Sequence, residues 1–209
     1  MLSQFRFLIA CLIAAVLLSG CISTKSFMDP SFPKVSYEDL KKRQAPIPLN
    51  LHVEFQRNGV HVPGVDATLR EGAERILRSS GVIEPVGDGG RGEILVVVNN
   101  IGDVGDARSK GFATGFTFGL VGSEVVDAYE MTVVVTMKGK VVARATASHA
   151  LHSVIGNATI PEGVEILPDG AGFPRVLEQM LIRALQDLQK TKELAGLLPA
   201  RSIASPLAG

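Results

Sequence analysis

The stretch YEMTVVVTMKGKVVARATASHAL, residues 129–151, decides the fold. Apolar residues recur at every second position from Tyr129 to Met137 and again from Val141 to Leu151, except at His149, and Lys138-Gly139-Lys140 lies between the two runs. Alternation at period two is typical of strands with one buried face, and a short glycine turn is typical of hairpins. The stretch therefore predicts a β-hairpin.

Three further segments predict strands before the hairpin. Residues 49–56 alternate between apolar and polar side chains, as in a half-buried strand. Residues 82–86 form a weaker strand pattern, and residues 94–98 are an unbroken, mostly β-branched apolar run. Such runs favour a central strand that is covered on at least one face.

Helical spacing appears twice. Residues 66–80 predict an amphipathic helix that Asp66 caps and Gly81 ends, and residues 174–190 predict a second helix. The apolar stripe of the second helix consists of Val176, Leu177, Met180, Leu181, Ala184, Leu185 and Leu188. Residues 46–192 are thus expected to form an α+β domain, a two-layer sandwich whose mostly antiparallel sheet of about four to five strands has two helices on one face.

The N-terminus has the features of a secretory signal. Arg6 precedes the apolar run 7–18, and small residues follow in Leu18-Ser19-Gly20-Cys21. The run has 12 residues, whereas a helix that crosses a bilayer needs about 20. The last four residues resemble the lipobox of bacterial lipoproteins. This resemblance implies a signal peptide over 1–20, cleavage before Cys21 and acylation of Cys21.

Acylation at Cys21 would determine where the protein resides. Two or more acyl chains, such as palmitate, make release from a membrane negligible. Ile22 stands where enterobacterial lipoproteins retained at the inner membrane carry aspartate, so the resemblance implies the periplasmic face of the outer membrane. Residues 21–45 show no sustained period and predict a lipidated N-terminus with a flexible tether, and residues 193–209 predict a flexible tail.

The order of the predicted elements resembles that of several periplasmic lipoproteins, among them the lipopolysaccharide-assembly lipoprotein and the periplasmic part of the curli-secretion lipoprotein. The segment from His149 to Asn157 also resembles a sequence motif found in uncharacterised proteobacterial lipoproteins. Neither resemblance transfers a functional residue to this chain.

Composition and motifs argue against several classes of function. The chain has 21 basic and 21 acidic residues, and a neutral balance disfavours nucleic acid as a partner. Gly87-x-Gly89-x-x-Gly92 has the spacing of a dinucleotide-binding loop but precedes a predicted strand where that chemistry needs a helix, so it predicts a turn. A Gly-x-Ser-x-Gly nucleophile elbow is missing from the sequence, and no cofactor is expected.

The four histidines do not predict a metal site. His149 and His152 would point to opposite faces of a strand, whereas His52 and His152 would share the wet face of the sheet. Asn99, Asn100, Asp103 and Asp106 form an oxygen-rich cluster without the spacing of a calcium loop, which favours a solvated strand end.

Residues 111–122 are the most unusual segment, with three phenylalanines and four glycines and no charge. As a strand, one face would carry Phe112, Phe116, Phe118 and Leu120, which we take as candidate contacts with a partner or the membrane. The alternative is that this segment covers the core of its own domain. A single inserted strand would leave backbone groups unpaired in lipid, so insertion would require several protomers or a partner's sheet edge.

The sequence as a whole predicts a non-enzymatic accessory lipoprotein of the outer membrane. Its domain would bind a protein or lipid partner, or further copies of itself, in an envelope assembly. The alternative is a periplasmic enzyme, or a carrier of a small apolar ligand, that uses the 99–122 and 153–171 loops as its pocket.

Overall fold

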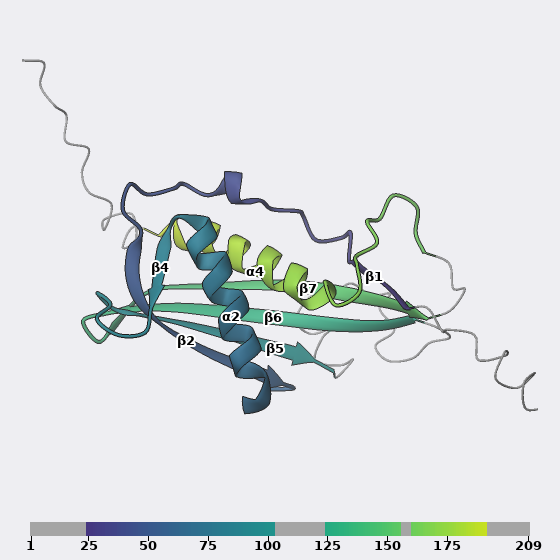
Figure 1. Cartoon of the computed structure of the whole chain (residues 1–209), viewed down its shortest axis with the longest axis horizontal. Helices are drawn as coiled ribbons and strands as arrows, with labels where there is room; N and C mark the ends of the chain where they lie inside the picture. The colour runs from purple at the N-terminus through teal and green to yellow at the C-terminus, as the bar shows by residue number, and fades with distance from the viewer. Residues whose placement is uncertain (1–23, 103–123, 156–159, 192–209) are drawn as a thin grey trace, which may run out of the picture.

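The computed structural model describes residues 24–102, 124–155 and 160–191. Figure 1 shows helices packed on one face of a long sheet. The elements of the described residues, in chain order, are β1 (Thr24–Met28), a short 3-10 helix η1 (Tyr37–Asp39), β2 (Ile47–Arg57), β3 (Val60–His61), α2 (Pro63–Ser80), β4 (Ile83–Val86), β5 (Glu93–Ile101), β6 (Glu124–Met137), β7 (Lys140–Ile155) and α4 (Gly172–Leu188).

The architecture is α+β, as the sequence predicts, but the sheet is larger and less regular than expected. Its strand order is β1-β7-β6-β5-β2-β3, with β4 beside β2. The described residues therefore form seven strands rather than four to five. Because β2 pairs in parallel with both β4 and β5, the sheet is mixed, although its other pairings are antiparallel.

The parallel pairing follows from the connection between β2 and β4. These two strands are joined through α2, and a crossover helix returns the chain in the same direction, so Ile47 lies opposite Ile83 in a parallel register. After β4 the chain passes to the other side of β2, where β5 is again parallel and Asn50 lies opposite Glu93. The crossing adds the two parallel pairings that the sequence did not predict, while the other four pairings are antiparallel as expected.

The glycine-rich turn 87–92 makes this crossing possible. The side-chain Oδ1 of Asn50 accepts the N–H of Gly90 at 2.9 Å. A Cβ atom on Gly90 would lie 2.6 Å from the Asn50 nitrogen, and one on Gly92 would lie 2.3 Å from the carbonyl oxygen of Thr136. Two of the glycines are therefore needed for close backbone approach, and the predicted turn is confirmed.

The hairpin of β6 and β7 is confirmed and forms the long axis of the sheet (Figure 1). Lys138 and Gly139 have φ angles of 50° and 73°. These left-handed conformations are those of a tight hairpin turn whose twist matches the strands. The pairing has one irregularity, between Val135 and Thr136.

The main core lies between the sheet and the two helices. Every residue of the predicted stripe on α4 is buried, and α2 contributes Leu69, Ala73, Ile76 and Leu77. The helices approach closely, because a Cβ on Gly72 would lie 2.8 Å from Leu177 Cδ2. Gly81 ends α2 in a left-handed conformation, as predicted, but the helix begins at Pro63. Asp66 therefore does not cap it, and its carboxylate accepts the N–H of Phe55 at 2.8 Å.

Residues 24–45 differ from the predicted flexible tether. β1 pairs with β7, and Phe27, opposite His152, is only 1% exposed. Residues 29–45, which we call the strap, then run across α4 (Figure 1). The side-chain amide of Gln179 bonds both backbone groups of Val35, at 2.8 Å each, and that of Gln189 bonds both backbone groups of Lys41.

The absence of a period in this region has a physical cause. The strap contributes isolated apolar side chains, such as the buried Leu40, and its backbone is held by side chains of α4. Tyr37 donates its hydroxyl to Glu178 at 2.9 Å, and burial together with Glu178 raises the pKa of Tyr37 to about 12. Contacts of this kind leave no repeating pattern in the sequence.

We expect Gly92→Ala to destabilise the domain by about 1 to 3 kcal/mol, because the added methyl would overlap the backbone of β6. Gly87→Ala is the matched control in the same turn, since a Cβ there meets nothing within 4 Å and should leave stability within about 0.5 kcal/mol of the wild type. Urea denaturation of both variants measures the difference. Equal stabilities would show that the glycines do not serve the strand crossing.

Candidate functional site

Four strand ends, those of β1, β5, β6 and β7, lie at the same end of the sheet. β1 begins at Thr24, opposite Ile155 at the end of β7, and β6 begins at Glu124, opposite Val154. β5 ends nearby at Ile101, opposite Ala128. We call this the β1 end of the sheet, and Figure 1 shows it at the right, opposite the end where α4 finishes.

The β1 end has a second apolar cluster on the face that the helices do not cover. It consists of Ile101, Val126, Ala128 and Ala150, all buried, with Phe32 of the strap packed against it. Side chains alternate between faces, so Ala150 lies on the face opposite to Ala147, which belongs to the main core. The sheet is therefore apolar on both faces at this end.

A buried carboxylate joins the strap to β7 beside this cluster. The backbone N–H of Asp29 donates to the carbonyl of Ala150 at 3.0 Å, and Oδ1 of Asp29 accepts the N–H of Ser31 at 2.8 Å. Oδ2 lies 3.8 Å from His152 Nε2. Burial acts to raise the pKa of Asp29, but His152 and the Ser31 bonds outweigh it and hold that pKa below its usual value.

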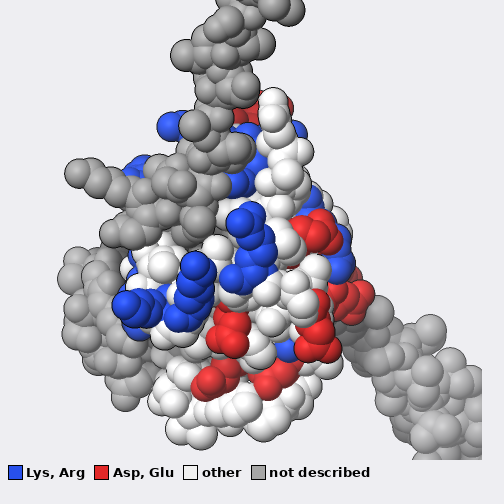
Figure 2. Space-filling view, turned by 90° about the vertical axis from the view of Figure 1, so that its left-hand side faces the viewer, with Lys and Arg blue, Asp and Glu red and all other residues white. Residues whose placement is uncertain are grey.

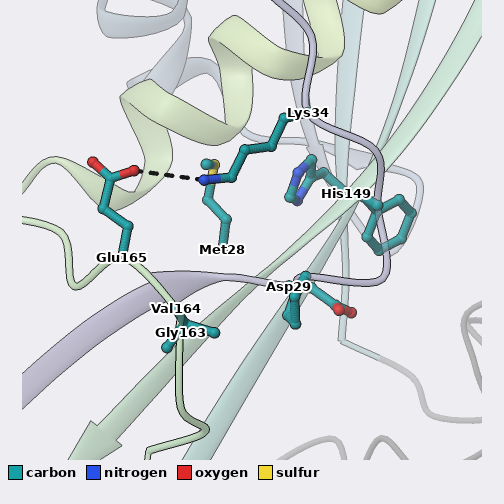
Figure 3. Close-up of a pocket in the computed structure, with 9 residues that line it drawn as sticks. Met28, Asp29, Lys34, His149, Gly163, Val164 and Glu165 are labelled. Atoms are coloured by element: carbon teal, nitrogen blue, oxygen red, sulfur yellow. Dashed lines mark ion pairs between the residues drawn. The ribbon is translucent and has the colours of Figure 1, made fainter.

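A small pocket of about 100 Å³ lies between the strap and the loop before α4 (Figure 3). His149 lines it and stacks on Phe32 with 4.8 Å between ring centroids, while Lys34 and Glu165 form an ion pair at 3.8 Å. Burial lowers the pKa of His149, so the imidazole is neutral at pH 7. A cavity of this volume accommodates a few water molecules, which is far less than a typical substrate pocket.

The two histidines of β7 lie on the faces that strand alternation predicts. His149 and His152 point to opposite faces, as predicted. His52 and His152 share the face of the sheet that the helices do not cover. His152 is mostly buried against Asp29, so the expectation that its side chain is exposed to solvent was wrong. The ring of His61 lies 2.7 Å from Asp66. Within the described ranges, no group of three or more His, Cys, Asp or Glu side chains is arranged to hold a metal ion.

Of the predicted contact residues, Cys21, Phe112, Phe116, Phe118 and Leu120 lie outside the described residues. From the two loops of the enzyme alternative, Gly163, Val164 and Glu165 line the small pocket, and none of residues 99–102 does.

Asparagines 58 and 99 have structural roles. Asn99 Oδ1 accepts the N–H of Gly59 at 2.9 Å, and Asn58 Oδ1 accepts that of Gly102 at 2.7 Å. These bonds join the β2–β3 turn to the end of β5. Asp103 and Asp106 lie outside the described residues.

Sequence reasoning missed Asp29 and Lys34, because both lie in the predicted tether. The one available signal was aromatic: Phe27 and Phe32 bracket Asp29, and each stacks on a histidine of β7. Among the residues that the structure describes, no helix is both long and apolar enough to cross a membrane.

Comparisons with known proteins find no matching family model and no matching curated protein. Among solved structures, the chain is similar to a dodecamer of a PelC variant from Paraburkholderia phytofirmans (12% identity, TM-score 0.33, 81% of this chain and 98% of that one). It is also similar to a candidate lipoprotein from Caulobacter crescentus, with 16% identity and a TM-score of 0.30 over 71% of this chain and 93% of that one. A third similar structure is protein XCC0632 from Xanthomonas campestris, of family DUF330, with 13% identity and a TM-score of 0.30 over 81% of this chain and 91% of that one. Likeness at this level identifies neither a family nor a function.

We expect Asp29→Asn to lower the free energy of unfolding by about 1 to 3 kcal/mol at pH 7. The pKa of Asp29 is lower in the folded chain than in the unfolded one, so its contribution is present above about pH 4 and is lost as pH falls through the folded value. The deficit of the variant should therefore shrink towards pH 3. Glu165→Gln, an exposed acid of the same pocket, is the control, and a deficit of Asp29→Asn that stayed constant as the pH fell below 4 would contradict the account.

Proposed function

We propose that this protein is a non-enzymatic accessory lipoprotein, held by acyl chains on Cys21 at the periplasmic face of the outer membrane. Support comes from the short distance in sequence between the predicted lipid and the fold. Cys21 precedes Thr24, the first residue of β1, by three positions, and three residues span at most about 10 Å. The β1 end of the sheet would therefore face the bilayer.

This short link gives the domain a preferred orientation. Had residues 22–45 been a free chain, the domain could have turned in any direction. With β1 paired to β7 and the strap bonded to α4, the 14 residues of β6 extend away from the membrane. At about 3.4 Å per residue the hairpin turn would stand about 45 Å from the β1 end.

The same orientation assigns a role to the apolar segment 111–122. Its described flanks, Ile101 and Glu124, both belong to the β1 end. In the proposed function, Phe112, Phe116, Phe118 and Leu120 contact the bilayer surface or a partner in the membrane. An apolar segment next to the lipid anchor would face acyl chains or apolar protein surface rather than open water.

The first test concerns attachment. Cys21→Ser should leave a folded chain that fractionates with soluble periplasmic proteins, whereas the acylated wild type stays with outer membranes after a high-salt wash. If Cys21→Ser stayed with the membranes to the same extent, acylation would not be the anchor.

The second test concerns the apolar segment. In the Cys21→Ser background, Phe116→Ser with Phe118→Ser should abolish residual flotation with lipid vesicles and leave the melting temperature unchanged. Val60→Ser with Ile166→Ser, two exposed apolar residues elsewhere, is the matched control and should leave flotation as it is. A large fall in melting temperature without a change in flotation would contradict this role and would indicate that residues 111–122 cover the core of their own domain.

A further inference from the structure

The two edges of the sheet differ in how far their backbone groups are hydrogen-bonded. On the outer side of β2, β4 pairs with residues 47–50 and β3 pairs with Gln56 and Arg57. Between these strands two side chains of α2 bond the exposed backbone, since Asp66 accepts the N–H of Phe55 and Arg70 donates to the carbonyl of Leu51 at 2.7 Å. This edge is closed to further strands.

Within residues 24–102, 124–155 and 160–191, no strand pairs with the outer edge of β7 over the first part of its length. β1 pairs with residues 151–155 only, and the last bond to this edge is from Asp29 N–H to the carbonyl of Ala150. Pro30 follows directly, and the strap departs towards α4, where Arg183 donates to the carbonyl of Pro33 at 3.3 Å. β1 therefore covers the β7 edge from Ala150 onward and no further back.

The open part of β7 presents unpaired backbone groups. N–H and C=O groups of a strand point alternately to its two sides, so the groups of Arg144, Thr146 and Ser148 point the same way as those of Ala150, away from β6. Among the described residues, no backbone or side-chain group bonds them from that side. An edge of this kind accepts an added strand.

A groove beside the edge has room for the side chains of such a strand. It has a volume of about 290 Å³ and lies between β7 and α4, with Phe32 and Pro33 of the strap also lining it. Thr146 and Ser148 line it from β7, and Met180, Arg183 and Asp187 line it from α4. Every second side chain of a strand added to β7 would point into this groove.

Charge indicates what kind of strand would bind. Exposed basic side chains border the open edge and its turn: Lys138, Lys140 and Arg144, with Arg183 in the groove. Figure 2 shows basic side chains on the hairpin-turn end of the molecule, with acidic side chains below and to the right of them. The nearby acids are Asp187, whose carboxylate Lys190 already pairs at 2.7 Å, Glu130, opposite Ser148 on the neighbouring strand, and Glu93, opposite Thr136 near the turn. The surroundings are therefore net positive.

We propose that the open edge of β7, residues 144–148, binds an extended acidic segment of a partner protein by strand addition. The backbone groups would supply the hydrogen bonds, and the basic border would select acidic side chains. This proposal names the class of partner for the proposed accessory function, and its main argument does not depend on acylation.

Two other occupants fit the observations less well. A second copy paired through its own β7 would bring two basic edges together and would point the two β1 ends in opposite directions, which two anchors in one membrane do not allow. Residues 192–209 of the same chain carry Lys192 and Arg201 against Glu193, so their charge does not match a basic edge.

The experiment uses the acylated protein in detergent and two capped seven-residue peptides, one alternating glutamate with valine and one alternating lysine with valine. The readout is amide hydrogen exchange, followed by NMR. The acidic peptide at ten times its dissociation constant should slow exchange at Arg144, Thr146 and Ser148 about tenfold, and the basic peptide should not. The proposal would be overturned if the acidic peptide did not slow amide exchange at these residues at concentrations up to about 1 mM. It would also be overturned if both peptides slowed exchange equally.

Variants make the test specific to the edge. Thr146→Pro removes an N–H that points away from β6, so the β6–β7 ladder stays intact and binding should weaken at least about tenfold. Thr132→Val, which changes the residue opposite Thr146 on β6, is the control and should bind as the wild type does. Arg144→Glu retains every backbone group and should reverse the preference between the peptides, which keeps the proposal testable if the proline variant does not fold. Unchanged binding by Arg144→Glu would contradict the charge argument. Because all these variants retain Cys21, failure here leaves the attachment results unaffected.

Discussion

The pairing of β1 with β7 is the constraint on which the rest of the account depends. It brings Phe27 against His152 and ends with the bond from Asp29 N–H to the carbonyl of Ala150. From Asp29 the strap runs over α4, where Gln179 bonds Val35. Without the pairing of β1 with β7, the strap would lose its starting point and the buried carboxylate of Asp29 would lose its position beside His152. The same five-residue strand stops short of the earlier half of β7, whose outer edge has no partner strand in the described part of the chain. One short element thus fixes both the membrane orientation proposed for the domain and its open edge.

The elements that dominate the sheet were predictable because their signals are local and periodic. The β6–β7 hairpin follows from alternation around Gly139, and α4 follows from a three-four stripe whose residues are all buried. The parallel pairing of β2 with β5 was not predictable in this way. It depends on the crossing of residues 87–92 over β2, and a glycine spacing alone does not tell a crossing from an ordinary turn.

The candidate site was predicted only in part, for a related reason. The positions of His149 and His152 on opposite faces followed from strand alternation, but their partners Phe32 and Asp29 lie more than a hundred residues earlier in an aperiodic segment. Bonds such as those from Gln179 to Val35 join side chains to backbone, and backbone groups are the same at every position of a sequence. A contact of this type is visible only once the chain is folded.

The most direct test of the central claim is amide hydrogen exchange at Phe27 in the purified protein. Phe27 N–H points towards β7, so the account predicts exchange as slow as that of Met131 in the middle of the sheet. Exchange at Phe27 as fast as in an unstructured peptide would contradict it. The lipid would then be joined to the domain by a free tether, and neither the orientation of the domain nor the limit of its open edge would follow.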